Sequence, residues 1–507
     1  MSHTQGFNMT FSFTALLLLV SAFIYAHGKP NIVYILTDDQ DIRLGSLDVQ
    51  PKLRSLVIEQ GIMFENAYVT TPVCCPSRSS ILTGKYVHNH RTYENGVGSG
   101  CDAQSWRDLN EHKTMGPYMS KAGYTTGFFG KYLNNYAQGS SGITVEHIPP
   151  GWDRWYTLVG NSKFYNYEVS NQGQSEKHGS NYTEDYFTDR VRDEAVDFIK
   201  KSADKPFFMY VATPAPHRPA TPAPQYANMF SDKVAPRTPS YGFAAPDKHW
   251  IITNGTPPLT PETTQVVDEL YRDRIRTLVS VDDLVEAIVN ELKNAGVMDN
   301  TYIFYNSDHG YHLGENNQQG EKRQPYDENI RVPFIAMGPG IPKNQKTSAL
   351  ALNIDMAPTF IDLGGGEIPD DMDGISLKSA LMSPIEQEEA QYHFMLEYYG
   401  EGHVAGLGFL HDCNNNTWVA LRSVDPKNAN GNKDILYARF YLKDDFPVQQ
   451  SEIYFREYFE LDEDPWEKVN LASSLPKEQM QKFEEILDTW YKCSGVSCRN
   501  LRKITLL

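Results

Sequence analysis

The sequence predicts an α/β fold in which a large, mostly parallel sheet is sandwiched by helices and a smaller C-terminal α+β subdomain follows. Short β-branched and aromatic runs alternate with amphipathic stretches from about Lys29 to about Ser383, which is typical of a parallel sheet covered by helices. Beyond about Pro384 the pattern changes to strand-like runs and one final helix. A chain of 507 residues with 40% hydrophobic residues can form one large core and a smaller second one. We therefore expect two units, residues 29–383 and 384–507.

Four expected strands of the large sheet are followed by polar residues. The strands are residues 31–36, 124–129, 206–211 and 301–305. The polar residues that follow them are Asp38 and Asp39, Lys131, His217, and Asp308 and His309. At any single strand end, polar residues can simply mark where the chain leaves the core. In open α/β sheets, however, ligands bind outside the carboxyl ends of the strands, so four such ends predict one functional site along that edge.

Helical periodicity is clearest in residues 184–201 and 262–294, where apolar side chains recur at roughly helical spacing. We interpret both helices as scaffold. In the C-terminal unit, the expected strands are residues 392–398, 417–422 and 435–442. The final helix, around residues 477–491, has an apolar face that should pack on this small sheet, formed by Met480, Phe483, Leu487 and Trp490.

The first 28 residues predict a signal peptide. An apolar run covers residues 11–25, and the small residues after it suit cleavage behind Ala26 or Gly28. Only His3 precedes the run, so a basic n-region is missing and a retained N-terminal anchor is the alternative. No second apolar stretch is long enough to span a bilayer.

Sequons and cysteines also fit the secretory pathway. Sequons begin at Asn181, Asn254 and Asn415. Six cysteines in this compartment suggest three disulfides. Cys493 and Cys498 are close enough for a local bridge, whereas the other four do not pair so simply.

The charge of the chain argues against two classes of partner. The formal net charge is −18, and no cluster of Lys and Arg is long enough to bind nucleic acid or an anionic membrane. We expect no nucleic-acid partner and no stable membrane insertion. Binding of an anionic substrate would require local cationic side chains or a bound metal ion to offset its negative charge.

Cys74 occupies a position that suits an anion. Pro76 fits the first position of a short helix and Gly84 the residue just past its end, so Cys74 would lie just ahead of the helix N-terminus. There the helix dipole and the free backbone N–H groups favour negative charge. The alternative is a structural pair with Cys75, but vicinal cysteines form strained disulfides.

The segment Cys74-Cys75-Pro76-Ser77-Arg78, with Leu-Thr-Gly ending at Gly84, resembles the signature of the type I sulfatase family. The resemblance implies an alkaline phosphatase-like fold and the oxidation of Cys74 to formylglycine by the formylglycine-generating enzyme. Cys75 then occupies the variable position of the signature. A geminal diol suits the reaction, because one hydroxyl can attack sulfur and the other can expel sulfate by reforming the aldehyde. Of the five cysteines that remain, at least one stays unpaired or pairs between chains.

Asp38 and Asp39 are adjacent carboxylates that would repel each other without a cation or hydrogen-bond donors nearby. All-oxygen ligation suits Ca²⁺ or Mg²⁺, and Asp308 adds a carboxylate at the same edge of the sheet. The sulfatase resemblance implies Ca²⁺ bound by Asp38, Asp39, Asp308 and the formylglycine oxygen at Cys74. It also places His309 at the fourth protein position, either as a metal ligand or as a hydrogen-bond partner of the nucleophile.

A sulfate ester needs cationic donors, which neutralise its charge and the charge that develops on the leaving oxygen. The resemblance assigns these roles to Arg78, Lys131, His217 and Lys322. Arg78 would steady the formylglycine and Lys131 would bind sulfate. His217 and Lys322 would hold sulfate and protonate the departing alcohol.

The base that triggers sulfate elimination is left open by one departure from the family pattern. Many relatives have a histidine two residues after the position of Lys131, where this chain has Leu133. His309, His88 and His90 are the candidates to replace it.

Within the family, the resemblance is closest to the N-acetylglucosamine-6-sulfatase group, on residues 74–78, 84–90, 130–134, 212–217 and 307–314. It implies an exo-acting enzyme that removes 6-sulfate from terminal N-acetylglucosamine of heparan or keratan sulfate. The implied partner is thus a sulfated glycosaminoglycan, and the implied location is the lysosome, with secretion as the alternative. A homodimer is one option for the assembly.

Several other functions compete with this hypothesis. Extracellular heparan endosulfatases share the same stretches, but they carry a long basic insertion that this chain lacks. An arylsulfatase of other specificity is a related option. A phosphatase or phosphodiesterase of the alkaline phosphatase superfamily would normally use Ser or Thr with two zinc ions and more His ligands. A non-catalytic binder of sulfated glycans is the alternative from outside enzymes.

Overall fold

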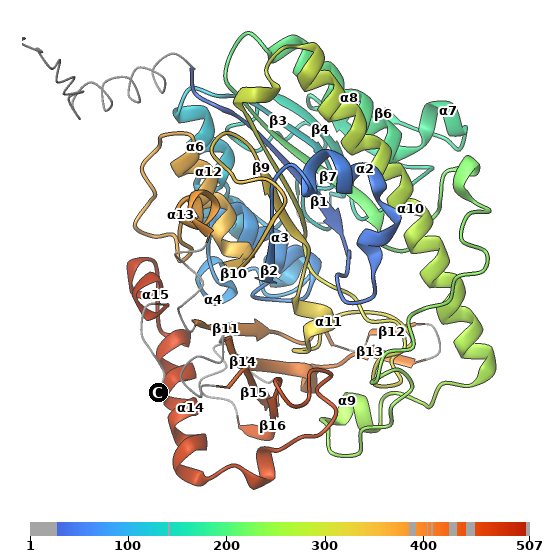
Figure 1. The fold of residues 1–507 in the computed structure, drawn as a ribbon, viewed down its shortest axis with the longest axis vertical. Coiled ribbons are helices and arrows are strands. Elements are labelled where there is room, and N and C mark those ends of the chain that lie inside the picture. The colour runs from blue at the N-terminus through green and yellow to red at the C-terminus, as the bar shows by residue number, and fades with distance from the viewer. Residues whose placement is uncertain are drawn as a thin grey trace, which may run out of the picture.

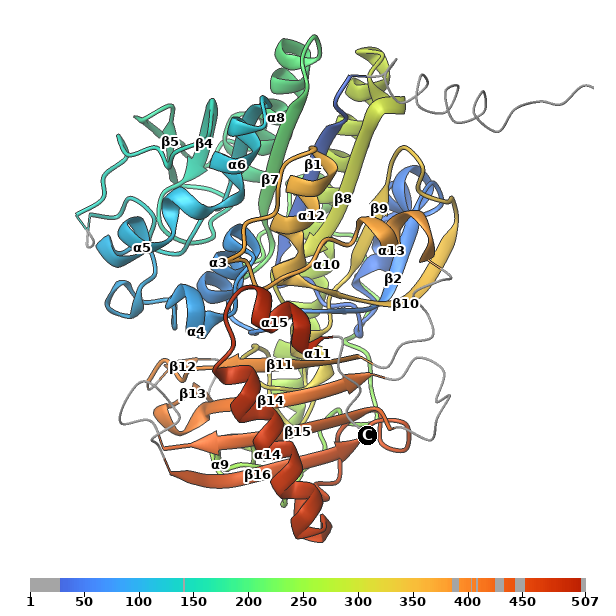
Figure 2. The same ribbon diagram turned by 90° about the vertical axis from the view of Figure 1, so that its left-hand side faces the viewer.

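The computed structural model describes residues 28–139, 142–384, 392–402, 404–406, 409–424, 433–442 and 452–502. The expected signal peptide, residues 1–28, lies outside these ranges except for Gly28. A ten-stranded sheet with its helices forms the upper part of the molecule, and a four-stranded sheet forms the lower part (Figures 1 and 2). Among the described helices, none combines the length and apolar character needed to cross a membrane.

The large sheet has the strand order β10-β2-β9-β8-β1-β7-β3-β4-β5-β6. Its central strands β8, β1, β7 and β3 are parallel, which confirms the predicted parallel sheet at its centre. Antiparallel pairs occur on both sides of this centre, so the whole sheet is mixed. The strands are β1 (Asn31–Asp38), β2 (Ile62–Tyr68), β3 (Thr125–Gly130), β4 (Arg154–Leu158), β5 (Glu168–Asn171), β6 (Gln174–Lys177), β7 (Phe207–Pro216), β8 (Thr301–Ser307), β9 (Phe334–Met337) and β10 (Gln345–Leu352).

Both faces of the large sheet are buried, because successive side chains of a strand point to opposite faces. In β1, Tyr34 contacts a core that includes Phe360, whereas Val33 belongs to a second core with Leu278. Helices α8 (Phe187–Ser202) and α10 (Pro261–Asn294) cover this second core. Helices α3 (Cys74–Thr83), α6 (Met115–Lys121) and α12 (Met356–Leu363) cover the first.

The two long helices begin close to the predicted positions. Helix α10 has Thr260 as its N-cap, whose hydroxyl accepts from the backbone N–H of Thr263, with Pro261 at the first helical position. The remaining short helices are α2 (Pro51–Leu53), α4 (Val87–His90), α5 (Gln104–Leu109), α7 (Tyr182–Asp185), α9 (Trp250–Thr253), α11 (Asp327–Ile330), α13 (Lys378–Met382) and α15 (Val496–Leu501).

The small sheet is antiparallel, with the order β11-β14-β15-β16, and α14 (Lys477–Tyr491) lies across it (Figure 2). As predicted, Phe483, Leu487 and Trp490 of α14 are buried, and Met480 is half-buried. A fourth strand and a short hairpin were not predicted. The elements are β11 (Tyr392–Tyr398), β12 (Val404–Gly406), β13 (Phe409–Asp412), β14 (Thr417–Val424), β15 (Ile435–Tyr441) and β16 (Ile453–Glu460).

Two disulfides stabilise the described structure. The predicted local bridge Cys493–Cys498 is confirmed, and Cys75 pairs with Cys101. Cys74 and Cys413 carry free thiols. The described residues thus form two disulfides instead of the three suggested by six cysteines. Cys74 keeps a free thiol although its neighbour Cys75 is disulfide-bonded.

Candidate active site

Cys74 is the first residue of α3, with Val73 in extended conformation as the N-cap. The helix thus begins two residues earlier than predicted, since Pro76 lies within its first turn. It ends where predicted, because Gly84 adopts a left-handed conformation with φ 68°. Arg78 follows Cys74 by four residues and therefore lies on the same face of the helix.

The carboxyl ends of the central strands meet beside this helix. Asp38 ends β1 and pairs in register with Pro216 of β7, while Gly130 of β3 pairs with Ala212 of the same strand. Lys131 and His217 come directly after β3 and β7, and Asp308 comes directly after β8. The prediction that these strand ends share one edge of the sheet is confirmed.

Three buried carboxylates form one cluster. Asp38, Asp39 and Asp308 each offer an oxygen atom, and these atoms lie within 4.8 Å of one another. The backbone N–H of Asp39 donates to Asp308 Oδ1 at 2.9 Å, which orients the two residues. Hard oxygen donors of this kind suit Ca²⁺, and so many buried carboxylates would repel each other without positive charge. The donor set therefore fits a divalent cation.

Three cationic side chains contact these carboxylates. Lys131 Nζ lies 2.8 Å from Asp38 Oδ2, and Lys322 Nζ lies 2.9 Å from Asp39 Oδ1. Arg78 Nε donates to Asp308 Oδ2 at 2.9 Å. Burial raises the pKa of Asp38, but Lys131, His217 and Arg78 hold it well below its usual range.

His309 faces both the nucleophile position and the carboxylates. Its Nδ1–H donates to the carbonyl of Gly310 at 2.9 Å, and its Nε2 lies 3.4 Å from Cys74 Sγ and 3.3 Å from Asp39 Oδ1. Burial lowers the pKa of His309, but the negative charges of Asp308, Cys74 and Asp39 outweigh it and raise that pKa to about 9. The imidazole is therefore oriented to donate a hydrogen bond to an anion at position 74.

His217 approaches the same point from the end of β7. Its Nδ1–H donates to the carbonyl of Arg218, and a ring nitrogen lies within 4.8 Å of ligand atoms of Asp39 and Cys74. Burial lowers the pKa of His217, but the Asp39 and Asp38 carboxylates raise it above its usual value. A protonated imidazole can therefore face position 74 from this side.

The site stabilises negative charge at Cys74. Burial raises the pKa of the Cys74 thiol, but Lys131, Lys322 and His309 hold this pKa well below its usual value. Because Cys74 Sγ stands where the nucleophilic oxygen of a formylglycine would be, the same cations would act on that oxygen and on a bound anion.

Two residues near the site were not predicted from the sequence. Ser162 donates its hydroxyl hydrogen bond to Asp38 Oδ2. It lies four residues after the end of β4, which is not one of the four strands expected from the sequence. Asn95 accepts from the backbone N–H of Cys75 at 2.9 Å and donates its own N–H to Glu401 of the C-terminal unit at 2.8 Å. Neither residue has a recognisable local motif.

The side chains of His88 and His90 form hydrogen bonds with groups other than Cys74, so the structure does not support them as replacement bases. His88 Nδ1 lies 3.0 Å from Glu397 Oε1, and His88 Nε2 donates to the carbonyl of Cys493 at 3.1 Å. His90 Nε2 lies 3.0 Å from Ser80 Oγ, and burial lowers the pKa of His90 to about 3. Of the three candidates, only His309 faces Cys74.

The sulfatase family model matches residues 30–366. The chain belongs to the sulfatase family. This sulfatase is 40% identical to human N-acetylglucosamine-6-sulfatase over 96% of this chain and 90% of the human protein. It is 45% identical to a putative extracellular sulfatase Sulf-1 homologue of Caenorhabditis elegans, over 71% of this chain and 50% of that protein.

Solved structures share the fold of this sulfatase. A protein solved with its substrate, D-glucosamine-2-N,6-O-disulfate, has a TM-score of 0.69 at 23% identity, over 92% of this chain and 98% of the other. A phosphonate monoester hydrolase of Silicibacter pomeroyi has a TM-score of 0.64 at 19% identity, over 94% of this chain and 96% of the other. The fold alone therefore does not distinguish a sulfate ester from a phosphorus ester as substrate.

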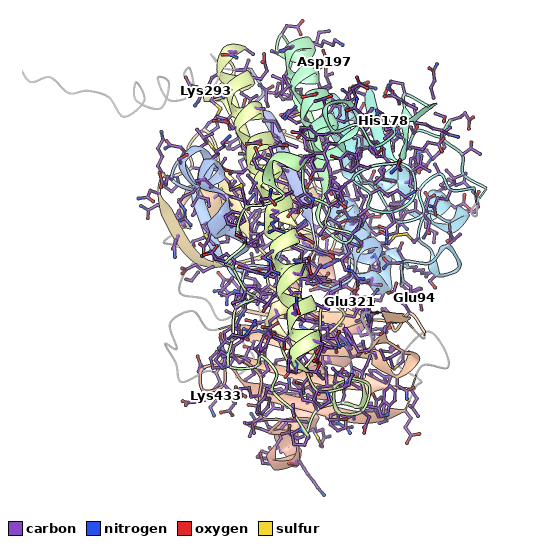
Figure 3. All side chains as sticks on the ribbon, turned by 90° about the vertical axis from the view of Figure 1, so that its right-hand side faces the viewer. Glu94, His178, Asp197, Lys293, Glu321 and Lys433 are labelled. Atoms are coloured by element: carbon purple, nitrogen blue, oxygen red, sulfur yellow. A yellow bond between two sulfur atoms is a disulfide. The ribbon has the colours of Figure 1, made fainter. Side chains whose placement is uncertain are left out.

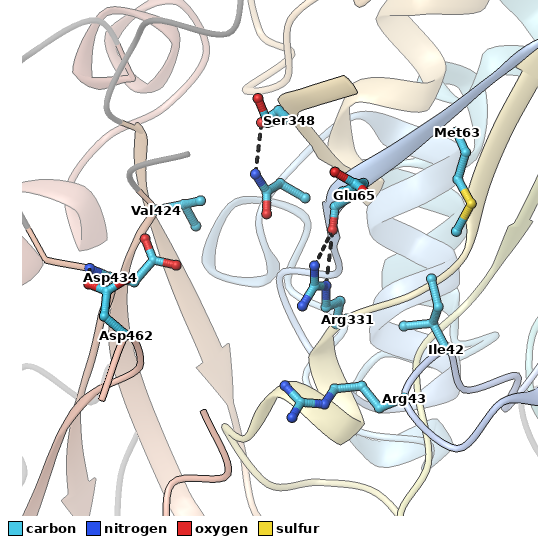
Figure 4. Close-up of a pocket in the computed structure, with 10 residues that line it drawn as sticks. Ile42, Arg43, Met63, Glu65, Arg331, Ser348, Val424, Asp434 and Asp462 are labelled. Atoms are coloured by element: carbon cyan, nitrogen blue, oxygen red, sulfur yellow. Dashed lines mark hydrogen bonds between the residues drawn. The ribbon is translucent and has the colours of Figure 1, made fainter. Parts of the chain in front are cut away.

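A separate cavity of about 590 Å³ lies beside β2 and the edge strand β10 of the large sheet, and Val424 of the small sheet also lines it (Figure 4). Arg331 and Glu65 both line it, and Arg331 donates two hydrogen bonds to the carbonyl of Glu65. None of the site residues described above lines this cavity, so it is distinct from the active site of this sulfatase.

Proposed function

We propose that this sulfatase hydrolyses the 6-sulfate of a terminal N-acetylglucosamine residue in heparan or keratan sulfate. The observation that carries the sulfate chemistry is a cluster of four cationic side chains. His217 and His309 lie beside Cys74, and Lys131 and Lys322 contact the neighbouring Asp38 and Asp39, inside a chain of net charge −18. These cations provide the local positive charge that an anionic ester requires. The sugar is supported by the 40% identity to human N-acetylglucosamine-6-sulfatase over nearly the whole chain.

Cys74 is the proposed precursor of formylglycine, and the formylglycine-generating enzyme is the partner that this proposal requires. A hydrated formylglycine supplies a diol with one hydroxyl for attack on sulfur and a second for release of sulfate. Asp38, Asp39 and Asp308 would hold Ca²⁺, which supplies a Lewis acid beside that diol. Their mutual distances and hard oxygen donors support this assignment.

The other side chains have separate proposed roles. Arg78 binds the Asp308 carboxylate and the carbonyl of Lys131, so it orients the residues around position 74. Lys131 and Lys322 bind the sulfate oxygens. His217, whose pKa is raised by the carboxylates, protonates the departing alcohol together with Lys322.

His309 is the proposed hydrogen-bond partner of the nucleophile, and the base for sulfate elimination once it has given up its proton. Its Nε2 faces Cys74 Sγ at 3.4 Å, which supports this role over that of a metal ligand. A nitrogen donor is also less typical for Ca²⁺ than an oxygen donor.

The secretory pathway is the proposed route, with the lysosome as the destination. The sequon residues Asn181, Asn254 and Asn415 are all exposed, as attachment of a glycan requires. Two disulfides fit an oxidising compartment. We also propose residues 29–383 as the catalytic domain and residues 384–507 as the C-terminal subdomain.

The test is a parallel assay of N-acetylglucosamine 6-sulfate and N-acetylglucosamine 6-phosphate with the purified secreted protein. We expect the sulfate ester to be hydrolysed with the higher kcat/KM. Faster turnover of the phosphate ester would overturn the assignment, and the phosphonate hydrolase of the same fold makes this comparison necessary.

An extracellular endosulfatase is the second candidate, because the identity to the Caenorhabditis elegans relative reaches 45% over the matched part. The two functions differ in the position of the sugar. An exo-acting enzyme releases sulfate only from the non-reducing end of a heparan oligosaccharide, so one sulfate is lost per chain. Loss of 6-sulfate from internal residues of an oligosaccharide with a blocked terminus would favour the endosulfatase.

A further inference from the structure

Arg274 is a buried cation on a helix that the sequence suggests is only scaffold. It lies in α10, the long helix that carries the labelled Lys293 in Figure 3, and only 1% of its surface is exposed. Ile275 and Leu278 on the same helix are buried apolar residues. A guanidinium among them carries a desolvation cost, so it is tolerated only where partners satisfy its donors.

The partners of Arg274 come from three separate loops of the active site. Its Nη2 donates to the carbonyl of Asp39 at 2.7 Å, and its Nη1 donates to the carbonyl of Pro216 at 3.3 Å. Its guanidinium lies over the ring of Tyr311, 3.8 Å from the centroid. These residues follow or end β1, β7 and β8, the strands that carry the carboxylates and histidines of the site.

Asp41 provides the counter-charge for Arg274. Asp41 Oδ1 lies 3.3 Å from Arg274 Nη2, and Asp41 Oδ2 accepts from the backbone N–H of Leu44 at 3.1 Å. Both side chains are buried. The pair therefore joins the loop after β1 directly to α10.

The contact with Asp39 matters because this residue has a left-handed backbone, with φ 73°. A non-glycine residue keeps such a conformation only where its surroundings hold it. The N–H of Asp39 is held by Asp308 Oδ1, and its carbonyl is held by Arg274. The direction of the Asp39 carboxylate thus depends on both contacts.

The contact with Pro216 acts on the other side of the site. Pro216 is the last residue of β7 and directly precedes His217. A hydrogen bond to the Pro216 carbonyl therefore helps to fix the backbone position from which the His217 side chain extends. One planar guanidinium with several fixed donors can bind two carbonyls and a carboxylate together, whereas an ammonium group of lysine has no such fork. All of these contacts of Arg274 are with residues around the site and not with Cys74.

We infer that Arg274 is a positioning residue, which holds Asp39 and His217 in one arrangement so that the metal-binding and sulfate-binding halves of the site are pre-organised. This inference rests on the proposed function of Asp39 and His217. Residues that orient metal ligands from behind typically affect metal affinity or activity by about 10–100-fold when they are replaced.

The test compares Arg274→Lys with Arg276→Lys in the full secreted chain. Arg276 lies on the same helix and binds Asp273 and the carbonyl of Met229, outside the site. Mass spectrometry of the Cys74 peptide first verifies equal conversion to formylglycine. Calcium affinity of the metal-stripped proteins is then measured by titration calorimetry, and kcat is measured with 4-nitrophenyl sulfate.

For Arg274→Lys we expect calcium affinity and kcat to fall at least about 10-fold, whereas Arg276→Lys stays within about twofold of the native protein. A folded Arg274→Lys protein with native calcium affinity and native kcat would overturn the inference. If Arg274→Lys does not fold, Asp41→Asn takes its place, because it weakens the same anchor from the other side. A folded Asp41→Asn protein with unchanged affinity and unchanged kcat would then overturn the inference.

Failure of the proposed function remains distinguishable from failure of this inference. If the native protein does not hydrolyse N-acetylglucosamine 6-sulfate, this result contradicts only the substrate assignment. The comparison of calcium affinity and of 4-nitrophenyl sulfate turnover among the variants still decides the role of Arg274.

Discussion

The Nε2 atom of His309 lies 3.4 Å from the Sγ atom of Cys74, and both residues are fully buried. The two belong to segments 235 positions apart, the loop after β8 and the first turn of α3. Among the candidate bases, this is the imidazole that can exchange a proton with a group at position 74.

His309→Ala is therefore expected to lower kcat by about 10²–10⁴-fold, the usual contribution of a positioned acid or base. The measurement is steady-state hydrolysis of N-acetylglucosamine 6-sulfate at saturating substrate. His88→Gln serves as the control, because His88 binds Glu397 instead of the site, and it should keep kcat within about threefold at low temperature. Near-native kcat for His309→Ala would rule out this role.

Cys74→Ala is expected to abolish hydrolysis while the fold is retained. The side chain is small and buried at the first position of α3, so its loss removes the nucleophile without removing a core residue of large volume. Circular dichroism verifies the fold, and sulfate release measures activity. Hydrolysis by Cys74→Ala at the native rate would contradict the mechanism.

The native protein tests the non-catalytic alternative. If it binds the sulfated sugar but does not hydrolyse it, the function of a non-catalytic glycan binder is favoured.

Asp38→Asn and Asp308→Asn are expected to lower calcium affinity and kcat together, since each removes one charge from the three-carboxylate cluster. Chelation of the native protein should lower kcat in the same way, and added Ca²⁺ should restore it. Asp48→Asn is a matched control on an exposed residue outside the site, which pairs with Arg54 at 3.5 Å. Native metal content together with native rates in both variants would exclude the proposed site.

His88 predicts a pH-dependent contribution to stability. Burial lowers the pKa of His88, but the buried Glu397 carboxylate 3.0 Å away and Asp373 raise it above its usual value. Tyr86 and Tyr491 both stack with the His88 ring, and Tyr399 donates to the Glu397 carboxylate. Because the folded-state pKa is the higher one, the ion pair stabilises fully below about pH 6.5 and is lost as the pH rises through the folded pKa.

His88→Gln should therefore lower the melting temperature more at pH 5 than at pH 9. The loss of a buried charged hydrogen bond corresponds to about 2 kcal/mol at the lower pH. Differential scanning fluorimetry at the two pH values measures the difference. An equal shift at both pH values would show that the imidazolium charge contributes nothing.

The local patterns of the sequence were sufficient for much of this protein. The four central strands β1, β3, β7 and β8 are buried and rich in apolar residues, and polar residues directly after each one mark its carboxyl end. Asp38, Lys131, His217 and Asp308 could therefore be assigned to one edge of the sheet from the sequence alone. The helix start near Cys74 and its end at Gly84 also depend on neighbouring residues alone. The apolar face of α14 was predictable for the same reason.

Only the tertiary structure determined the contacts between residues that lie far apart in the chain. Arg274 binds the carbonyl of a residue 235 positions away, and Ser162 binds a carboxylate 124 positions away. A single polar residue in a helix or loop has no periodicity and no motif, so nothing local identifies its partner. The choice of His309 over His88 and His90 as the base belongs to the same class. The sequence placed His309 at a strand end but left all three histidines open for this role, and packing determines that the His309 imidazole faces Cys74.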